Sequence, residues 1–325
     1  MLYPLKFHSI FKEKIWGGEK IKTILKKDFS PLNNCGESWE LSGIEGNISK
    51  VKGGPHEGKD LKSLISEYKE DLIGSRIYDR FRDEFPLLIK FIDSNEDLSI
   101  QVHPDDKLAK SRHNSFGKTE MWYIIQADNN ASLISGFNRS LNRQIYIDHV
   151  KQGRLLELLN KLDVYNGDVF YIPAGRVHTI GKGLLLAEIQ QTSDVTYRIY
   201  DFDRVDKLGK KRELHLEDSL NAIDYRFYED YKTIYKDKTN QPVQLISCDY
   251  FTTNKIKLDR YLDRDYQTLD SFIALICVEG AGMIGYSNGV IDISLGDVIL
   301  IPAKYKNITL KTELKMTLLE TYVTR

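Results

Sequence analysis

The chain has 325 residues, with 46 lysines and arginines against 47 aspartates and glutamates, which gives a formal net charge of −1. This balance argues against a general nucleic-acid or membrane-surface binder, because such proteins carry excess positive charge. With 41% hydrophobic and 29% charged residues, the composition is that of a folded protein and excludes disorder as its main state. The length favours one large domain or two ordinary ones.

The sequence also indicates where the protein resides. No apolar run approaches the roughly 20 residues of a membrane helix. Lys6 and His8 interrupt the apolar block that a secretory signal would need near the N-terminus. We therefore expect a cytoplasmic protein with neither a membrane nor a nucleic-acid partner. Three widely spaced cysteines, Cys35, Cys248 and Cys277, suit neither a disulfide framework nor a cysteine zinc cluster, so we expect structural roles for them.

Three segments have apolar side chains at the three- and four-residue spacing typical of amphipathic helices. They are residues 59–84, 139–162 and 214–225. Elsewhere, short apolar runs predominate and predict the many short strands of a sandwich or small barrel. The 19 tyrosines and 13 phenylalanines also favour β-structure, where aromatic side chains pack well on a pleated surface.

An internal repeat indicates two similar β-units. Residues 167–174 read GDVFYIPA and residues 296–303 read GDVILIPA, and each follows a similar upstream strand and turn. A polar segment, 226–241, joins the two copies. We therefore expect a catalytic domain at 1–235, containing the three helical segments, and a second domain at 236–325. The residue eleven positions after Gly167 is His178, whereas the residue eleven positions after Gly296 is Asn307, so we expect the second copy to be degenerate.

Residues suited to metal binding gather in the first copy. Because side chains alternate along a strand, Gln101 and His103 share one face, and Lys118 and Glu120 share another. An amide oxygen, two imidazoles and a carboxylate are ligand types that Zn²⁺ accepts, with room left for water or a substrate oxygen, although iron accepts them too. Each residue alone has an ordinary structural interpretation. Their occurrence within one predicted barrel favours a metal site.

Four stretches together closely resemble a known family. They are LSIQVHPDD (98–106), GKTEMWYII (117–125), GDVFYIPAGRVHTI (167–180) and QTSDVTYRIYDFDR (191–204). They are similar to the short bacterial form of type I mannose-6-phosphate isomerase, a zinc enzyme of the cupin superfamily. The resemblance implies a mainly β fold of two cupin-like β-barrels of the jelly-roll type. The first would carry short helical insertions, and the second would be a degenerate cupin.

The resemblance also implies roles for individual residues. One zinc ion per chain would be held by Gln101, His103, Glu120 and His178. The implied active-site residues are Lys118 and Arg198. Positions associated with the substrate are Ser99, Lys90, Asp194 and Arg204, with Asp194 also a candidate ion-pair partner for Arg198. Trp16 is a further candidate, either as an aromatic wall for the sugar or as an ordinary core residue.

The implied reaction interconverts D-mannose 6-phosphate and D-fructose 6-phosphate through a cis-enediol. The proton carrier is either Lys118 or a zinc-bound water, and the sequence does not choose between them. Three alternatives stay open: an isomerase of unphosphorylated sugar, a non-catalytic sugar-binding or regulatory cupin, and an iron-dependent cupin oxygenase. A polar, basic rim favours an anionic sugar over an apolar aromatic substrate. The expected partner is the sugar phosphate, and the chain is expected to be a monomer or a homodimer.

Overall fold

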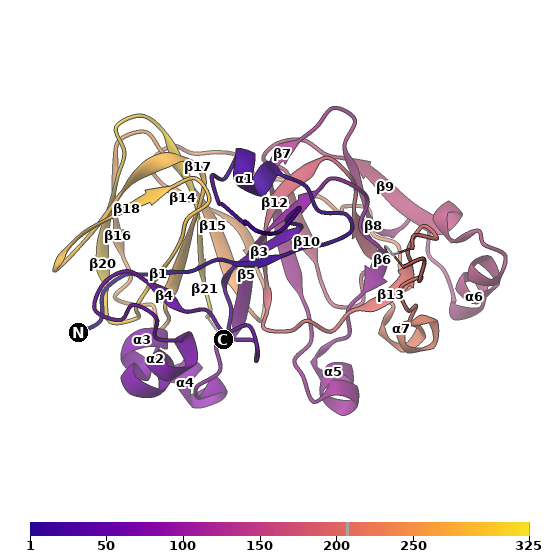
Figure 1. The fold of residues 1–325 in the computed structure, drawn as a ribbon, viewed down its shortest axis with the longest axis horizontal. Helices are drawn as coiled ribbons and strands as arrows, with labels where there is room; N and C mark the ends of the chain where they lie inside the picture. The colour runs from indigo at the N-terminus through magenta and orange to yellow at the C-terminus, as the bar shows by residue number, and fades with distance from the viewer. Residues whose placement is uncertain (206–207, 325) are drawn as a thin grey trace.

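The computed structural model describes residues 1–205 and 208–324. Two β-rich halves lie side by side, with short helices at the periphery (Figure 1). The predicted mainly β class is confirmed. No helix in the described part of the chain is long and apolar enough to cross a membrane.

The first half consists of two sheets. One has the strand order β10-β7-β12-β5-β3-β2 and the other has the order β13-β6-β11-β8-β9. The strands of the larger sheet are β2 (Ile10–Lys12), β3 (Glu37–Leu41), β5 (Leu87–Ser94), β7 (Glu120–Ala127), β10 (Val169–Ile172) and β12 (Leu184–Gln191). The strands of the smaller sheet are β6 (Ile100–Val102), β8 (Ser132–Phe137), β9 (Leu159–Asp163), β11 (His178–Ile180) and β13 (Tyr197–Tyr200).

The second half is one ten-stranded sheet that folds back on itself. Its main path is β14-β15-β21-β17-β19-β1-β4, and β16, β18 and β20 branch from it through β17. Its strands are β1 (Leu5–Phe7), β4 (Val51–Lys52), β14 (Pro242–Ser247), β15 (Thr252–Leu258), β16 (Tyr261–Asp265), β17 (Ile273–Tyr286), β18 (Gly289–Ser294), β19 (Val298–Ile301), β20 (Asn307–Lys311) and β21 (Met316–Tyr322). Within the described residues, hydrogen bonding closes none of the three sheets into a ring, so the number of barrels stays a prediction.

The sequence repeat corresponds to a repeated strand order. The path β10-β7-β12-β5 in the first half matches β19-β17-β21-β15 in the second. Gly167 and Gly296 begin the repeated stretches with φ of +85° and +90°, a conformation that glycine adopts at little cost. In the structure, the residue of the second half that corresponds to the buried His178 is Ile308 and not Asn307. Asn307 is exposed, whereas Ile308 lies in the core of the second half.

The helices only partly follow the sequence prediction. The described helices are α1 (Lys20–Thr23), α2 (Leu61–Tyr68), α3 (Glu70–Ile73), α4 (Ser75–Phe81), α5 (Asp106–His113), α6 (Arg143–Lys151), the 3₁₀ helix η1 (Leu155–Leu158) and α7 (Leu216–Ala222). The segment predicted as a helix over 139–162 stops at Lys151, because Gly153 turns the chain with φ +70°. Its last residues form strand β9, where burial alternates.

The largest hydrophobic core joins the two halves. Strand β1 pairs with β19 through Leu5 and Leu300. Helix α3 also contacts the second half, since Ile73 O accepts from Phe272 N at 3.3 Å. Residues near the N-terminus therefore complete the C-terminal sheet, and the proposed domain boundary at residue 235 stays a prediction.

Candidate metal centre

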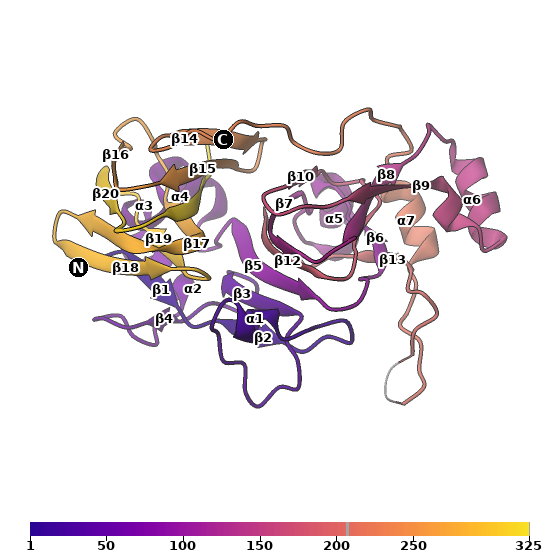
Figure 2. The same ribbon diagram turned by 90° about the horizontal axis from the view of Figure 1, so that it is seen from above.

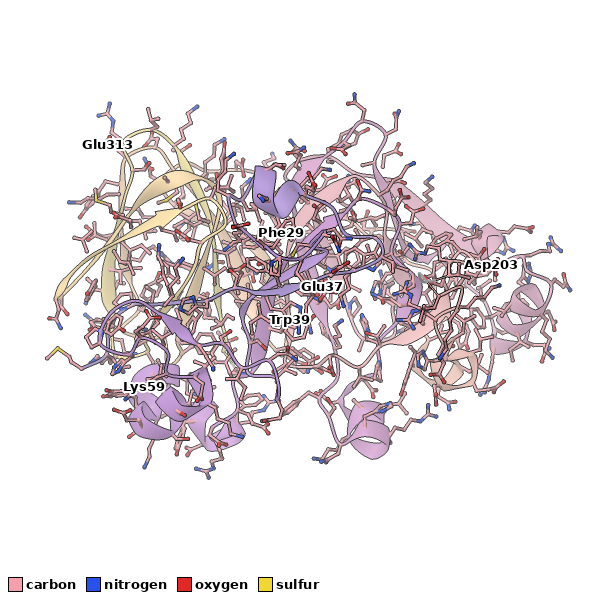
Figure 3. All side chains as sticks on the ribbon, in the orientation of Figure 1. Phe29, Glu37, Trp39, Lys59, Asp203 and Glu313 are labelled. Atoms are coloured by element: carbon pink, nitrogen blue, oxygen red, sulfur yellow. The ribbon has the colours of Figure 1, made fainter. Side chains whose placement is uncertain are left out.

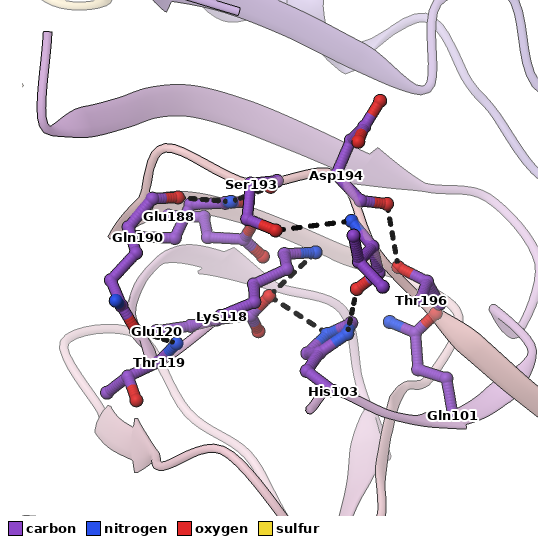
Figure 4. A network of polar contacts seen from close by, with 12 residues as sticks. Gln101, His103, Lys118, Thr119, Glu120, Glu188, Gln190, Ser193, Asp194 and Thr196 are labelled. Atoms are coloured by element: carbon purple, nitrogen blue, oxygen red, sulfur yellow. Dashed lines mark hydrogen bonds and ion pairs between the residues drawn. The ribbon is translucent and has the colours of Figure 1, made fainter. Parts of the chain in front are cut away.

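Three strands bring one carboxylate and two imidazoles together. Glu120 opens β7, His178 opens β11, and His103 directly follows β6. One ligand atom from each of these residues lies within 4.8 Å of the others, and all three residues are buried. Figure 4 shows the side chains of His103, Lys118 and Glu120 pointing toward one another. The alternation argued from the sequence therefore places these candidates in one cluster.

Both imidazoles are oriented by main-chain carbonyl groups. The Nδ1 of His103 donates to Val195 O at 3.1 Å, and the Nδ1 of His178 donates to Arg176 O at 2.8 Å. Each Nε2 is left to face Glu120, at 3.1 Å from Oε1 for His103 and 3.8 Å from Oε2 for His178. This tautomer directs a ring-nitrogen lone pair toward the carboxylate, as in histidines that ligate metals.

The polar atoms at the centre of this cluster lack hydrogen bonds. Among the described residues, neither oxygen of Glu120 nor the Nε2 of His103 has a partner in hydrogen-bonding geometry, although both residues are only 1% exposed. The ammonium of Lys118 lies 2.9 Å from Oε1 of Glu120 and supplies one positive charge. Buried polar atoms are normally hydrogen-bonded or bound to a metal. The cluster therefore fits a divalent metal ion.

The electrostatic environment keeps these ligands in the form that binds metal. Burial lowers the pKa of His103 to about 3 and also lowers the pKa of His178, so both rings are neutral at pH 7. Burial alone would raise the pKa of Glu120, but the Lys118 ammonium holds it well below its usual range. A metal needs neutral imidazole and ionised carboxylate.

Gln101 lies at the edge of this cluster. It pairs with His178 across β6 and β11, and its amide nitrogen lies 3.2 Å from Nε2 of His178. In this orientation the amide donates to the same nitrogen that faces Glu120. A half-turn of the amide would place its oxygen there instead, as a metal ligand would require.

A cavity of about 230 Å³ opens next to the cluster. Seven predicted site residues line it: Trp16, Lys90, Ser99, Gln101, Lys118, Asp194 and Arg198. Trp16 also packs in the hydrophobic core of the first half, as one of its two predicted roles requires, and its contact with the sugar stays a prediction. The metal-ligand cluster and most of the predicted substrate residues are thus contiguous.

The cavity contains charged residues that the sequence argument did not identify. Lys90 lies 2.9 Å from Glu188 and 3.9 Å from Glu37, and Lys14 lies 3.3 Å from Glu37. Figure 3 labels Glu37 with Trp39, whose Nε1 donates to it at 2.7 Å. Glu188 could have been identified from the sequence, because it is a charged residue within the otherwise apolar run LLLAEIQQ (184–191).

Three arginines and one aspartate lie around the chain that follows β13. Arg198 and Arg212 line the cavity, whereas Arg204 is absent from its lining. Asp201 binds Arg204 at 2.5 Å and accepts from Nε of Arg212 at 2.7 Å. Burial alone would raise the pKa of Asp201, but the two guanidinium groups lower it. Arg212 therefore places a second guanidinium at the cavity beside that of Arg198.

Asp194 does not contact Arg198 in the way that the sequence suggested. Asp194 is exposed, and the ion pairs of the described residues include none between the two side chains. Figure 4 shows the Asp194 carboxylate on the side away from His103. Arg198 instead donates to the main-chain oxygen of Glu213 at 2.9 Å.

Comparison with known proteins identifies the family. Residues 4–130 match the family model for the catalytic domain of type I phosphomannose isomerase, and residues 242–321 match the cupin domain of mannose-6-phosphate isomerase. The chain is 37% identical over 305 residues to mannose-6-phosphate isomerase ManA of Bacillus subtilis, covering 92% of this chain and 93% of that protein. The chain belongs to the type I phosphomannose isomerase family. The recognition made from four motifs is confirmed.

Other members of the phosphomannose isomerase family agree with this assignment. Mannose-6-phosphate isomerase of Streptococcus mutans is 40% identical over 69% of this chain and 68% of its own length. The crystal structure of mannose 6-phosphate isomerase from Bacillus subtilis superposes with a TM-score of 0.89 at 32% identity, covering 99% of this chain and 100% of that one. The chain is therefore an enzyme of this family with a cupin fold.

Proposed function

We propose that the protein is a zinc-dependent isomerase that interconverts D-mannose 6-phosphate and D-fructose 6-phosphate. The observation that carries the proposal is the buried His103–Glu120–His178 cluster, which adjoins a cavity lined by Lys118. Within the described part of the chain, Nε2 of His103 and both oxygens of Glu120 lack partners in hydrogen-bonding geometry. Family membership supports the sugar-phosphate substrate.

Zinc accepts this set of donors, as iron also does, and the resemblance to the zinc-dependent family favours zinc. Two imidazoles and one carboxylate, with the Gln101 oxygen as a fourth donor, resemble zinc sites that keep a position open for substrate. When bound, zinc would act as a Lewis acid on charge that develops at the substrate oxygens. We assign one zinc ion per chain to Gln101, His103, Glu120 and His178.

Two residues of the cavity suit the proton transfer between C1 and C2. Lys118 lies against Glu120 and can donate to a substrate oxygen as the cis-enediol forms. Glu188 also lines the cavity, and burial together with the nearby Glu120 carboxylate raises its pKa. A carboxyl group with a raised pKa is suited to exchanging a proton near neutral pH. Lys118 and Glu188 are thus the two proton carriers that we propose to test.

The guanidinium groups of Arg198 and Arg212 suit the phosphate of the substrate. Both line the cavity, and a planar guanidinium fork matches phosphate oxygens in two-point hydrogen bonding. Ser99 and Lys90 stay predicted substrate contacts, with Lys90 ion-paired to Glu188. Asp194 and Arg204 also stay predictions, although Arg204 is bound by Asp201 and lies outside the cavity lining.

The test is a coupled assay with mannose 6-phosphate beside free mannose, before and after chelation and zinc return. We expect turnover of the phosphate ester that chelation abolishes and zinc restores. Substitution His178→Ala should remove both bound metal and turnover. Absence of turnover with either sugar, in a folded and zinc-loaded protein, would favour the non-catalytic sugar-binding cupin. Turnover of free mannose alone would favour an isomerase of unphosphorylated sugar.

The polar cavity argues against a cupin oxygenase that acts on an apolar aromatic substrate, because Lys90, Lys118 and Arg198 all line it. The cytoplasmic location and the choice between monomer and homodimer stay predictions.

A further inference from the structure

The turn between β10 and β11, residues 173–177, contacts the main chain or ring of both histidine ligands. Gly175 N donates to His103 O at 2.9 Å, and Arg176 O accepts from Nδ1 of His178 at 2.8 Å. Gly175 has φ +89°, and a Cβ there would lie 2.9 Å from Ala222 O, so another residue would displace this turn. The position of the turn therefore determines how the two imidazoles face Glu120.

The side chain of Arg176 anchors this turn between two tyrosine rings. Its guanidinium carbon lies 4.5 Å from the centre of the Tyr228 ring and 4.6 Å from that of Tyr231, and the residue is only 7% exposed. Ion pairs among the described residues include none to Arg176. A buried guanidinium is costly without compensation, and stacking on aromatic faces supplies part of it. The tyrosine pair, Tyr228 and Tyr231, is thus the main support of this side chain.

The tyrosine pair is itself held in place by hydrogen bonds. Tyr231 OH donates to Phe137 O at 2.9 Å and accepts from Tyr228 N at 3.1 Å. Tyr228 OH donates to Asp224 at 2.7 Å, and Asp224 N donates to Gly175 O at 2.8 Å. Both tyrosines belong to the segment that runs from α7 along one face to β14 (Figure 2). This connecting segment therefore contacts the turn in two ways, through the hydrogen bond from Asp224 to Gly175 and through the tyrosine rings that stack on Arg176.

Tyr231 also packs against the strand next to His178. A Cβ on Gly136 would lie 2.3 Å from Cε1 of Tyr231, so glycine is needed where the ring lies against β8. Gly136 N donates to Val177 O at 2.7 Å, and the neighbouring Ser135 pairs with His178. The ring of Tyr231 thus packs on β8, the strand that pairs with His178. The same ring stacks on Arg176, whose main-chain carbonyl orients the His178 imidazole.

We propose that Arg176, Tyr228 and Tyr231 are positioning residues for the metal site. By holding the turn, they keep the Arg176 carbonyl in hydrogen-bonding position and Nε2 of His178 directed at Glu120. This inference rests on the proposed metal site. Loss of a group that orients a metal-ligating histidine typically weakens metal binding about 10–100-fold. The connecting segment between the two halves therefore contributes to metal affinity although none of its residues is a ligand.

The experiment measures binding of Co²⁺ to the metal-free full-length chain by competition with a chelator, together with the visible spectrum of the bound ion. We expect Arg176→Leu and Tyr228→Leu to raise the Co²⁺ dissociation constant roughly 10–100-fold and to change the spectrum. Arg176→Lys, which keeps a cation between the rings, should recover most of the affinity. All measurements are made far below the melting temperature of each metal-free variant.

Arg226→Leu is the matched control. Arg226 stacks on the same Tyr228 ring at 5.5 Å and pairs with Asp224, but its side chain is 75% exposed and lies outside the turn. It should leave Co²⁺ affinity unchanged. Wild-type affinity and spectrum in Tyr228→Leu, or equal weakening in Arg226→Leu, would overturn the inference. If Arg176→Leu does not fold, Tyr228→Leu decides the question. Failure of the wild-type chain to bind Co²⁺ would instead overturn the proposed metal site.

Discussion

The charged residues of the cavity are held by neighbours of opposite sign. Lys14, Glu37, Lys90 and Glu188 alternate in charge along its wall, and each lies within 3.9 Å of the next. Burial alone would raise the pKa of Glu37, but Lys90 and Lys14 lower it to about 2. The wall therefore offers fixed charges and hydrogen-bonding groups to a polar ligand.

This arrangement makes the stability of the protein depend on pH in the acid range. The folded-state pKa of Glu37, about 2, lies below its ordinary value of 4.5, so the unfolded chain binds more protons at acid pH. The stabilisation, up to about 3 kcal/mol, is present above pH 4.5 and is lost as the pH falls toward 2. We expect Glu37→Gln to lower the free energy of unfolding at pH 7 and to flatten its decrease below pH 4.5. Urea titrations between pH 2.5 and 7 measure both effects.

Substitutions of Arg212 and Arg204 test which guanidinium binds the phosphate. Arg212 lines the cavity and Arg204 does not, although Asp201 binds both. Hydrogen bonds to charged groups contribute about 1.5–3 kcal/mol, so we expect Arg212→Ala to raise KM for mannose 6-phosphate roughly tenfold or more with a smaller change in kcat. Steady-state kinetics with Arg204→Ala as the comparison check this. A larger KM increase in Arg204→Ala would assign the phosphate to Arg204 instead.

Site residues could be predicted from the sequence where a local pattern, such as alternation along one strand, fixes the side-chain direction. Residues that reach the cavity through the path of a longer segment could not. Gln101, His103, Lys118 and Glu120 were predictable as candidates because alternation along a strand fixes which side chains share a face. The position of Arg212 depends on how the chain after β13 returns to the cavity, which no local pattern encodes. The prediction of an ion pair between Asp194 and Arg198 was wrong for the same reason. The two residues are close in sequence, but their side chains do not meet, and Arg198 donates to Glu213 O instead.

Among elements, the two halves use matching strands differently. Glu188 on β12 and Glu320 on β21 occupy corresponding strands, and both are buried. Glu188 lines the cavity, whereas Glu320 accepts two 2.9 Å hydrogen bonds from Arg264 of β16. Arg264 pairs in register with Ile308, whereas Gln101 pairs with His178. Arg264 and Ile308 thus occupy the positions that correspond to the proposed ligands Gln101 and His178, which supports the prediction that the second copy is degenerate.

The ion pair predicts an asymmetric response to mutation. Arg264→Met leaves the Glu320 carboxylate buried, with Tyr266 and Asn254 as its remaining donors among the described residues, so we expect the free energy of unfolding to fall by about 3–5 kcal/mol. The double substitution Arg264→Met with Glu320→Leu should recover much of this loss, because apolar side chains can fill the same space. Urea denaturation of the three proteins provides the comparison. A double variant no more stable than Arg264→Met would contradict this explanation.

Helix boundaries show the limits of local periodicity. The apolar spacing over 59–84 predicted helix correctly but not its division into α2, α3 and α4, where Lys69 and Gly74 break the hydrogen-bonding pattern with positive φ. Helix α5 escaped prediction because its residues are mostly polar and only Ala109 is buried. Its start depends instead on Asp105, which accepts from Leu108 N at 2.8 Å.

For the whole molecule, the shared core predicts cooperative unfolding. The rings of Phe85 and Phe272 lie 4.6 Å apart within the core cluster that joins residues of both halves. We expect one calorimetric transition with equal van't Hoff and calorimetric enthalpies. A fragment of residues 1–235 should lack a cooperative transition and bind a hydrophobic dye, since its core face would be uncovered. Independent cooperative melting of this fragment would show instead that the predicted boundary separates autonomous domains.

The pairing of β1 with β19 has a consequence for how the chain is made. Leu5 precedes its partner Leu300 by 295 residues in the chain. Contacts between residues so distant in the chain form slowly, because the intervening loop must close first. Strand β1 must therefore wait without this neighbour until β19 has left the ribosome, although its other partner, β4, follows soon after it in the chain. We expect the free edge of β1 and the apolar side chains behind it to be exposed during this interval, which favours aggregation.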